Sequence, residues 1–291
     1  MPHMEPLKLL FIINPGAGTR NIHWPSEIDA FFNLLPHTTE QFLLEQHCSI
    51  DTIKDKINAS APDRVVAVGG DGTVKLVAEC LLHTNIILGI LPGGSANGLA
   101  KELGIPADVQ GALQHLLKPE TQRIHLVEIN HQRCIHLSDI GFNASVIKLF
   151  ELGRRRGMAG YISAAWKVLW KHAVMQVTLQ MGSHTIRRQA AMVVIANATR
   201  YGSGAVINPL GRLDDDVFEV VIIKKVSFAE IFKMMVTHRP YDKTKTELYQ
   251  TQSLNIQSKK KVHFQIDGDY LGKTDRIEAS ILINALTIIK Q

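Results

Sequence analysis

The first 120 residues alternate short, continuous apolar runs with stretches of helical periodicity. Residues 7–13, 64–68 and 86–91 are apolar almost throughout, as expected for strands covered on both faces of a parallel sheet. Apolar side chains then recur at three- and four-residue spacing after Pro25 and after Ser49, which predicts helices. This alternation predicts an α/β domain with a parallel sheet, in which ligands bind beyond the carboxyl ends of the strands.

After about residue 122 the pattern changes to a series of strands with few helices. Strands are predicted at residues 123–129, 133–140, 174–181, 186–198, 217–224, 251–256, 261–266 and 276–283. Helices are predicted at residues 143–150, 158–171 and 227–236. We therefore expect two domains, an α/β domain at residues 1–121 and a mostly antiparallel β domain at residues 122–281.

Two glycine turns connect predicted strands to predicted helices in the first domain. The first reads Gly-Gly-Asp-Gly-Thr at residues 69–73, and the second reads Pro-Gly-Gly-Ser-Ala-Asn at residues 92–97. In this layout backbone N–H groups and a helix N-terminus can face a bound phosphate. One such turn often only connects two elements. Two of them, carrying Asp71, Thr73 and Asn97, indicate a phosphate-handling enzyme.

The turns do not match two common nucleotide motifs. No Gly-Lys-Ser/Thr sequence occurs, and the glycines at residues 16 and 18 lack the third glycine of a dinucleotide fingerprint. Asp71 cannot contact a phosphate unless a cation lies between them, so it indicates a metal ion or an acceptor for a hydroxyl group. The alternative is an ordinary turn in which the aspartate caps a helix.

Composition and net charge exclude few classes of binding partner. The chain has 291 residues, 45% of them apolar, and a net charge of +5. A mildly basic protein can meet nucleic acid, an anionic membrane or a phosphorylated substrate. No nucleic-acid-binding module is recognisable, so nucleic acid is not an expected partner. No apolar run is long enough to span a membrane. We expect a cytoplasmic protein whose membrane contact is peripheral.

A basic run supplies the candidate for that membrane contact. Arg154, Arg155 and Arg156 are followed by Lys167 and Lys171. Near an anionic surface each cation contributes about 1 kcal/mol, so the three arginines together contribute about 3 kcal/mol. A plain solvated charge run is an equally good interpretation. The sequence leaves both a monomer and a homodimer open.

The ordered motifs resemble the catalytic family of diacylglycerol kinases, which includes bacterial soluble lipid kinases and sphingosine kinases and is related to NAD kinases. The resemblance starts with the Asn-Pro turn at residues 14–18 and the two glycine turns. It continues through Asp-Ile-Gly-Phe from Asp139, through Gly-Ser-Gly-x4-Pro at residues 202–209 with Asp215, and to Asp-Gly-Asp at residues 267–269. It covers nearly the whole chain in order.

The resemblance implies an ATP-binding first domain followed by a β-sandwich, with residues 282–291 packing back on the first domain. ATP and Mg²⁺ are the implied cofactors. The residues implied around the nucleotide are Asn14, Gly69, Gly70, Asp71, Gly72, Thr73, Gly94, Ser95 and Asn97. A threonine that the family usually has in the second strand-to-helix loop has no clear counterpart, and Glu45 is nearest.

Two metal sites are implied by the same resemblance. Asp71 would hold the active-site Mg²⁺ beside the phosphates. Asp215 would anchor a structural Mg²⁺ with the backbone carbonyls of Arg212 and Val217. The family usually has glycine where this chain has Asp216, and a positive φ at that position would strain an aspartate. Taken alone, the carboxylates at residues 214–216 are more typical of a solvated turn.

The resemblance assigns the general base to Asp269, which would accept the proton of the lipid hydroxyl. The family more often has glutamate here, so this side chain reaches about 1.5 Å less far. A polar hairpin turn is the alternative interpretation. Removal of a general base typically costs about 10²–10⁴-fold in rate.

The sequence says less about which lipid accepts the phosphate. Gly98 follows Asn97 where diacylglycerol kinases have an aspartate, which favours a sphingosine-type pattern. Phe142 and the apolar side chains of the helix predicted at residues 158–171 could line an acyl-chain pocket or pack in the core of the second domain. We therefore predict an ATP- and Mg²⁺-dependent lipid kinase acting on a diacylglycerol-like or sphingoid-base-like lipid. The alternatives are an NAD kinase-like phosphotransferase and a lipid- or nucleotide-binding regulator that has lost catalysis.

Overall fold

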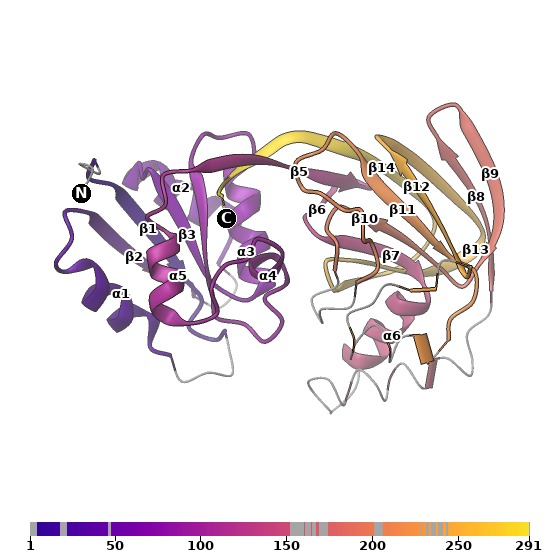
Figure 1. Ribbon diagram of the computed structural model, residues 1–291, viewed down its shortest axis with the longest axis horizontal. Helices are drawn as coiled ribbons and strands as arrows, with labels where there is room; N and C mark the ends of the chain where they lie inside the picture. Colours follow the sequence, from indigo (N-terminus) through magenta and orange to yellow (C-terminus); the bar gives the residue numbers. More distant parts are fainter. Residues whose placement is uncertain are drawn as a thin grey trace. The chain divides into compact units, whose positions relative to one another are not determined.

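A computed structural model describes residues 5–17, 22–45, 48–151, 160, 164, 167–168, 174–200, 206–227, 229–230, 233, 237, 241–242 and 244–290. The chain divides into two compact units. The first comprises Met1–Ile124 and Asn284–Gln291, and the second comprises His125–Ile283. Figure 1 shows the elements of each unit.

The first unit contains a parallel sheet in the order β2-β1-β3-β4, extended by the last residues of β14. Its strands are β1 (Lys8–Ile13), β2 (Thr38–Leu43), β3 (Arg64–Gly69) and β4 (Ile87–Pro92), and Thr287 of β14 (Asp269–Ile289) pairs with Ile87. Its helices are α1 (Trp24–Phe32), α2 (Ile50–Ser60), α3 (Asp71–Leu81), α4 (Gly98–Glu102) and α5 (Val109–His115). The predicted parallel α/β domain is confirmed.

Burial explains why the apolar runs became strands. Every residue of β3 is buried, and in β1 every residue after Lys8 is buried.

Two helices begin at capping residues. The Ser49 hydroxyl accepts from the N–H of Thr52 at 3.1 Å, and the Asp108 carboxylate accepts from the N–H of Gly111 at 2.7 Å. Such caps satisfy amide groups that the helix itself leaves unpaired.

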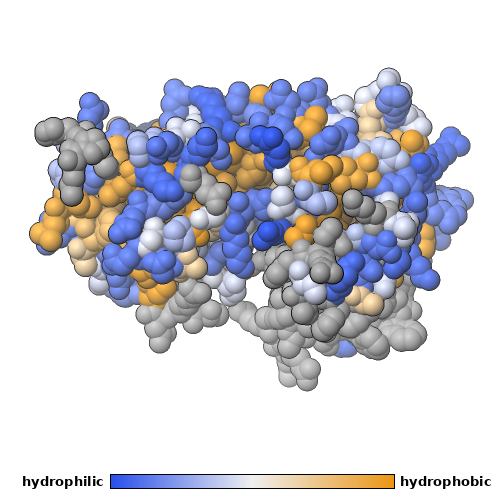
Figure 2. Space-filling model, in the orientation of Figure 1, coloured by the Kyte–Doolittle hydropathy of each residue, from blue (hydrophilic) through white to orange (hydrophobic). Residues whose placement is uncertain are grey.

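The sequence analysis missed β2. This strand is at the edge of the parallel sheet, none of its residues is fully buried, and its sequence mixes polar and apolar side chains. An edge strand therefore lacks the continuous apolar run that identifies a central parallel strand. Apolar residues gather near α1 and β2 on the face shown in Figure 2. Two large apolar side chains of this part of the chain are exposed, Leu34 at 90% and Leu43 at 52%.

The second unit is mainly antiparallel. Its strands pair in the order β12-β11-β10-β7-β13-β14. In addition, β8 pairs with β13 and β9 with β8, while β5 pairs with β14 and β6 with β5. They are β5 (Thr121–Ile129), β6 (Gln132–Cys134), β7 (Leu137–Gly141), β8 (Met175–Met181), β9 (His184–Ala190), β10 (Met192–Ala196), β11 (Phe218–Ile223), β12 (Thr246–Thr251) and β13 (Ser253–Ile266). Helix α6 (Phe142–Glu151) follows β7.

Strands β10 and β11 are buried on both faces, and their alternate side chains enter two different cores. Val193 and Val220 pack in a core with the inward residues of β8 and β13. Val194 and Val221 pack in a second core with residues of α6. This arrangement confirms the expected antiparallel β-sandwich, with an additional helical layer.

Several predicted strands have different boundaries. The run at residues 186–198 is two strands, β9 and β10, separated by Ala191, and the run at residues 133–140 is divided into β6 and β7. Residues 253–256 and the run at residues 261–266 belong to one strand, β13, whose pairing with β14 is irregular between Gln257 and Val262. Thr251 instead ends β12, a strand that the sequence analysis missed. Apolar patterning identifies buried residues but does not show where a strand crosses from one pairing partner to another.

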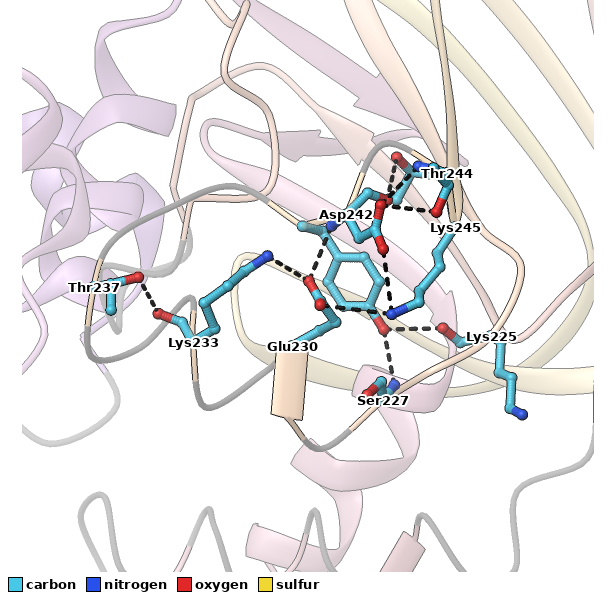
Figure 3. Close-up of polar contacts among 10 residues, drawn as sticks. Lys225, Ser227, Glu230, Lys233, Thr237, Asp242, Thr244 and Lys245 are labelled. Atoms are coloured by element: carbon cyan, nitrogen blue, oxygen red, sulfur yellow. Dashed lines mark hydrogen bonds and ion pairs between the residues drawn. The ribbon is translucent and has the colours of Figure 1, made fainter.

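The connection between β11 and β12 is held by buried and ionic contacts (Figure 3). The Tyr241 hydroxyl donates to the carbonyl of Lys225 at 2.9 Å and accepts from the N–H of Ser227 at 2.8 Å. Burial raises the pKa of Tyr241 to about 12. Glu230 accepts from the Lys233 ammonium group at 2.6 Å and from the N–H of Asp242 at 3.0 Å.

Most of the two later predicted helices, at residues 158–171 and 227–236, lies outside the described residues, as do Arg154, Arg155 and Arg156. Among the helices that the structure does describe, none is long and apolar enough to cross a membrane.

Candidate functional site

The two glycine turns of the first unit pack directly against each other. The N–H of Gly93 donates to the carbonyl of Gly69 at 2.8 Å. A Cβ atom on Gly94 would lie 2.5 Å from the Cα of Gly70, and one on Gly69 would lie 2.5 Å from Oγ1 of Thr73. Both distances are too short for a side chain. Gly94 is therefore required for the contact between the turns, and Gly69 for the close approach of the Thr73 side chain, independently of any ligand.

Asn14 joins the end of β1 to these turns. Its backbone N–H donates to the carbonyl of Val68 at 3.0 Å, and its side-chain Nδ2 donates to Oγ1 of Thr73 at 3.1 Å. Its Oδ1 accepts from the N–H of Gly16 at 3.0 Å. The predicted Asn-Pro turn is thus tied to the first turn of α3.

Asn97 holds the second turn in shape. Its Oδ1 accepts from the N–H of Gly94 at 2.8 Å, and its Nδ2 donates to the carbonyl of the same residue at 2.7 Å. Its φ of 49° lies in the left-handed region, which asparagine tolerates better than most residues. Asp71 reaches across from α3, and its Oδ1 accepts from the N–H of Leu99 at 3.4 Å.

The start of α3 is suited to an anion. Gly70 occupies the N-cap position and supplies no capping side chain, and Gly72 is exposed with open space where a Cβ would be. The first amides of a helix are unpaired within the helix and attract negative charge. The residues predicted around the nucleotide all lie at the carboxyl ends of β1, β3 and β4. Ser95 is exposed there.

In the second unit, Asp267 and Gly268 form the turn between β13 and β14, at φ values of 51° and 94°. Ile266 and Asp269 pair across this turn. The Asp267 carboxylate accepts from three consecutive backbone N–H groups, those of Ile135 at 3.0 Å, His136 at 2.9 Å and Leu137 at 3.2 Å. Asp269 is exposed at the first position of β14. The two aspartates of this motif therefore have different surroundings.

A buried polar chain lies behind the turn. Gln265 donates through Nε2 to Oδ2 of Asp139 at 2.6 Å and accepts at Oε1 from the N–H of Gly268 at 2.7 Å. Both side chains belong to residues that are 1% exposed. The sequence analysis placed Asp139 only in a motif and did not single out Gln265. The sequence feature that could have identified Gln265 is a polar residue between the apolar Phe264 and Ile266 of a predicted strand.

Asp215 lies in the loop before β11. Burial raises the pKa of its carboxyl group. Among the described residues its Oδ1 is buried and has no hydrogen-bond partner. Such an oxygen is costly unless a donor or a cation satisfies it. The neighbouring Asp214 pairs with Arg212 at 3.1 Å, and the hydrogen bond from that guanidinium lowers the pKa of Asp214.

Other acceptor oxygens in the second unit are also buried without a partner among the described residues, namely Oδ1 of Asn197 and Oδ1 of Asn208. Burial raises the pKa of Glu219, which accepts from Asn208 Nδ2 at 2.6 Å. Asp216 does not adopt a positive φ, so the expected strain at this position is absent. Its Oδ1 lies 3.3 Å from Nε2 of His125. No cluster of three His, Cys, Asp or Glu side chains suited to a metal occurs in the part of the chain that the structure describes.

Comparison with known proteins agrees with this arrangement. The family model of the diacylglycerol kinase catalytic domain matches residues 8–129, and that of the YegS C-terminal NAD kinase beta sandwich-like domain matches residues 138–290. These two domains define the class, that of lipid kinases with a catalytic α/β domain and a β-sandwich. The chain belongs to the diacylglycerol kinase family.

Individual relatives are distant. The chain is 23% identical to a diacylglycerol kinase of Staphylococcus haemolyticus over 219 residues, which cover 72% of this chain and 66% of that protein. The chain therefore spans about two thirds of the length of this curated relative.

Solved structures share the fold. A diacylglycerol kinase structure from Bacillus anthracis has a TM-score of 0.76 at 19% identity, covering 99% of this chain and 98% of that one. An NAD kinase from Archaeoglobus fulgidus, solved in complex with ATP, has a TM-score of 0.55 at 13% identity, covering 98% and 94%.

Proposed function

We propose that this protein transfers the γ-phosphate of ATP to a hydroxyl group of a lipid, in a reaction that depends on Mg²⁺. The observation that carries the proposal is the meeting of three strand ends in the first unit. Hydrogen bonds join Asn14 to Thr73 and Gly93 to Gly69 beside the open N-terminus of α3. In a member of the diacylglycerol kinase family, this arrangement is best explained as a site for the phosphates of ATP.

The binding residues proposed for ATP are those at these strand ends: Asn14, Gly69, Gly70, Asp71, Gly72, Thr73, Gly94, Ser95 and Asn97. Phosphoryl transfer needs alignment and charge neutralisation more than covalent participation of the protein. Backbone N–H groups at the start of α3 supply part of that neutralisation. Asp71 would hold Mg²⁺, which neutralises the remaining phosphate charge when bound.

The Asp215 region fits a second Mg²⁺ site. The Oδ1 of Asp215 is buried and has no donor in the described part of the chain, and a hard cation satisfies an oxygen of this kind. The backbone carbonyls of Arg212 and Val217 are the further ligands we assign. This site lies away from the phosphate loops along the chain, so its role would be to stabilise the loop before β11.

Asp269 is the general base that we assign. Its carboxylate would accept the proton of the lipid hydroxyl as the oxygen attacks the γ-phosphorus and ADP departs. The exposed position at the start of β14, directly after a turn held by Asp267 and Gly268, supports this role. Asp267 is a poorer candidate, because its carboxylate already accepts from the N–H groups of Ile135, His136 and Leu137.

The lipid is a diacylglycerol-like or sphingoid-base-like alcohol. Gly98 after Asn97 favours the sphingoid type, while the named relatives favour diacylglycerol. Phe142 is 4% exposed and packs in the core under α6, which supports a structural role for this residue. A cytoplasmic enzyme with transient membrane contact through Arg154, Arg155 and Arg156 is part of the proposal, and these arginines lie outside the described residues.

The test is an assay of purified protein with radiolabelled ATP, Mg²⁺ and a mixed lipid extract, with mass spectrometry of the product. A labelled phospholipid is expected, and Asp71→Asn should reduce its formation strongly. Parallel incubation with NAD tests the NAD kinase alternative. Formation of NADP without labelled lipid, or tight ATP binding with no product in either arm, would overturn the proposal.

A further inference from the structure

The turn that presents Asp269 is connected to the core of the second unit through Gln265. This residue lies directly opposite Asp139 in the pairing of β13 with β7. Its amide is used at both ends, since Nε2 donates to Asp139 at 2.6 Å and Oε1 accepts from Gly268 N–H at 2.7 Å. Fully buried polar groups are nearly always paired in this way.

The Asp139 carboxylate sets the direction of the Gln265 amide. Its Oδ1 accepts from the N–H of Ala144 at 2.8 Å, and its Oδ2 accepts from Nδ2 of Asn143 at 2.6 Å. Both donors lie in the first turn of α6. Because a carboxylate accepts and does not donate, Gln265 must turn its NH₂ group toward Asp139. Its carbonyl oxygen then faces Gly268.

The turn is consequently held from two sides. The Asp267 carboxylate accepts from the backbone of the segment before β7, and the Gly268 amide donates to Gln265. Asp269 follows immediately in the chain. A general base must lie within hydrogen-bond reach of its proton, and a displacement of about 1 Å can cost about 10²-fold in rate.

We propose that Gln265 and Asp139 are positioning residues that fix the orientation of Asp269, an inference that rests on the proposed function. Neither side chain is required to touch the lipid or ATP. The buried carboxylate orients the amide, the amide fixes the turn, and the turn fixes the first residue of β14.

The test compares two replacements of Gln265 in the lipid kinase assay. Gln265→Met keeps the length of the side chain and removes its donor and acceptor, so we expect kcat to fall about 10- to 100-fold with an unchanged KM for ATP. Gln265→Glu keeps an acceptor for Gly268 and can share a proton with Asp139. Its kcat should lie between those of Gln265→Met and the unmodified protein.

Ser138→Ala is the matched structural control. The Ser138 hydroxyl donates to the backbone carbonyl of Gln265 at 2.7 Å, so this variant weakens the same strand pair without touching the turn. We expect it to lower thermal stability and to leave kcat within about twofold. An equal loss of kcat in Ser138→Ala and Gln265→Met would contradict positioning, as would a kcat within twofold in Gln265→Met.

Hydrogen exchange of the Gly268 amide provides a readout that does not need activity. Protection of this amide should fall in Gln265→Met and persist in Ser138→Ala and Gln265→Glu. If the unmodified protein phosphorylates no lipid, the proposed function fails while this exchange still decides whether Gln265 holds the turn. Unchanged protection in Gln265→Met overturns the inference. Should Gln265→Met fail to fold, kcat of Gln265→Glu decides: a value below that of Ser138→Ala supports positioning, and a value equal to it contradicts positioning.

Discussion

Glycines at the ends of β3 and β4 contact one another through backbone atoms. The sequence analysis assigned these glycines to phosphate binding, and the structure adds a reason that does not involve a ligand. Gly70 and Gly94 approach so closely that a methyl group on either one meets the other residue. A glycine in such a motif can be required for packing of the two turns, for phosphate binding, or for both. The sequence alone does not distinguish these requirements.

A pair of glycine substitutions separates them. In Gly94→Ala the added Cβ would lie 2.5 Å from the Cα of Gly70, so we expect the free energy of unfolding to fall by about 1–3 kcal/mol. In Gly72→Ala nothing lies within 4 Å of the added Cβ, and alanine favours the helix, so stability should rise by up to about 1 kcal/mol. Urea denaturation of both variants measures the difference. Equal effects would contradict the packing argument.

The two aspartates of the β13–β14 turn should respond differently to substitution. Asp267→Gly tolerates the positive φ and removes the acceptor of three backbone N–H groups, so the free energy of unfolding should fall by about 1–3 kcal/mol. Asp269→Asn should leave stability nearly unchanged, because this residue is exposed. Thermal melting of both variants tests this. A larger loss in Asp269→Asn would reverse the assignment of their roles.

At the scale of elements, apolar runs predicted β1, β3 and β4 because those strands are buried in the parallel sheet. The same reasoning failed for β2, whose edge position does not require an apolar sequence. It also failed to divide the run at residues 186–198, because the chain changes direction there at buried residues around Ala191. The apolar pattern of a short segment indicates which residues are buried. Strand pairing depends instead on segments that are distant along the chain.

A polar cluster joins β9, β12 and Lys224, the residue after β11, and gives a pH-dependent contribution to stability. Hydrogen bonds from Tyr249 and then Arg188 hold the pKa of Glu247 at about 2, and Lys224 pairs with the same carboxylate. Because this pKa is lower in the folded state than the ordinary value near 4.5, the contribution is present above that value and is lost as pH falls toward 2.

The comparison of Glu247→Gln with the unmodified protein isolates this contribution. The difference in their free energies of unfolding should be largest above pH 5 and should shrink as the pH approaches 2. Denaturation in urea at a series of pH values measures it. A difference that stays constant from pH 7 to pH 2 would show that the ionised carboxylate contributes nothing.

For the whole molecule, the sequence predicted an α/β unit followed by a mostly antiparallel β unit. It also predicted the candidate residues that lie at the carboxyl ends of β1, β3 and β4. The order of motifs supplied this information, because each motif ends a strand or begins a helix. The sequence did not reveal Gln265, since its role depends on pairing with Asp139, which lies 126 positions away along the chain. Contacts of this length become visible only when the fold is known.

The most direct measurement is phosphoryl transfer from radiolabelled ATP to a lipid alcohol, tested with diacylglycerol and with a sphingoid base. The unmodified protein should label one of them, and Asp269→Asn should lower kcat by about 10²–10⁴-fold. Asp275→Asn, at another exposed aspartate of β14, should retain full activity. Full activity of Asp269→Asn, or no transfer to either lipid by the unmodified protein, would contradict the central claim that Asp269 deprotonates a lipid hydroxyl for attack on ATP.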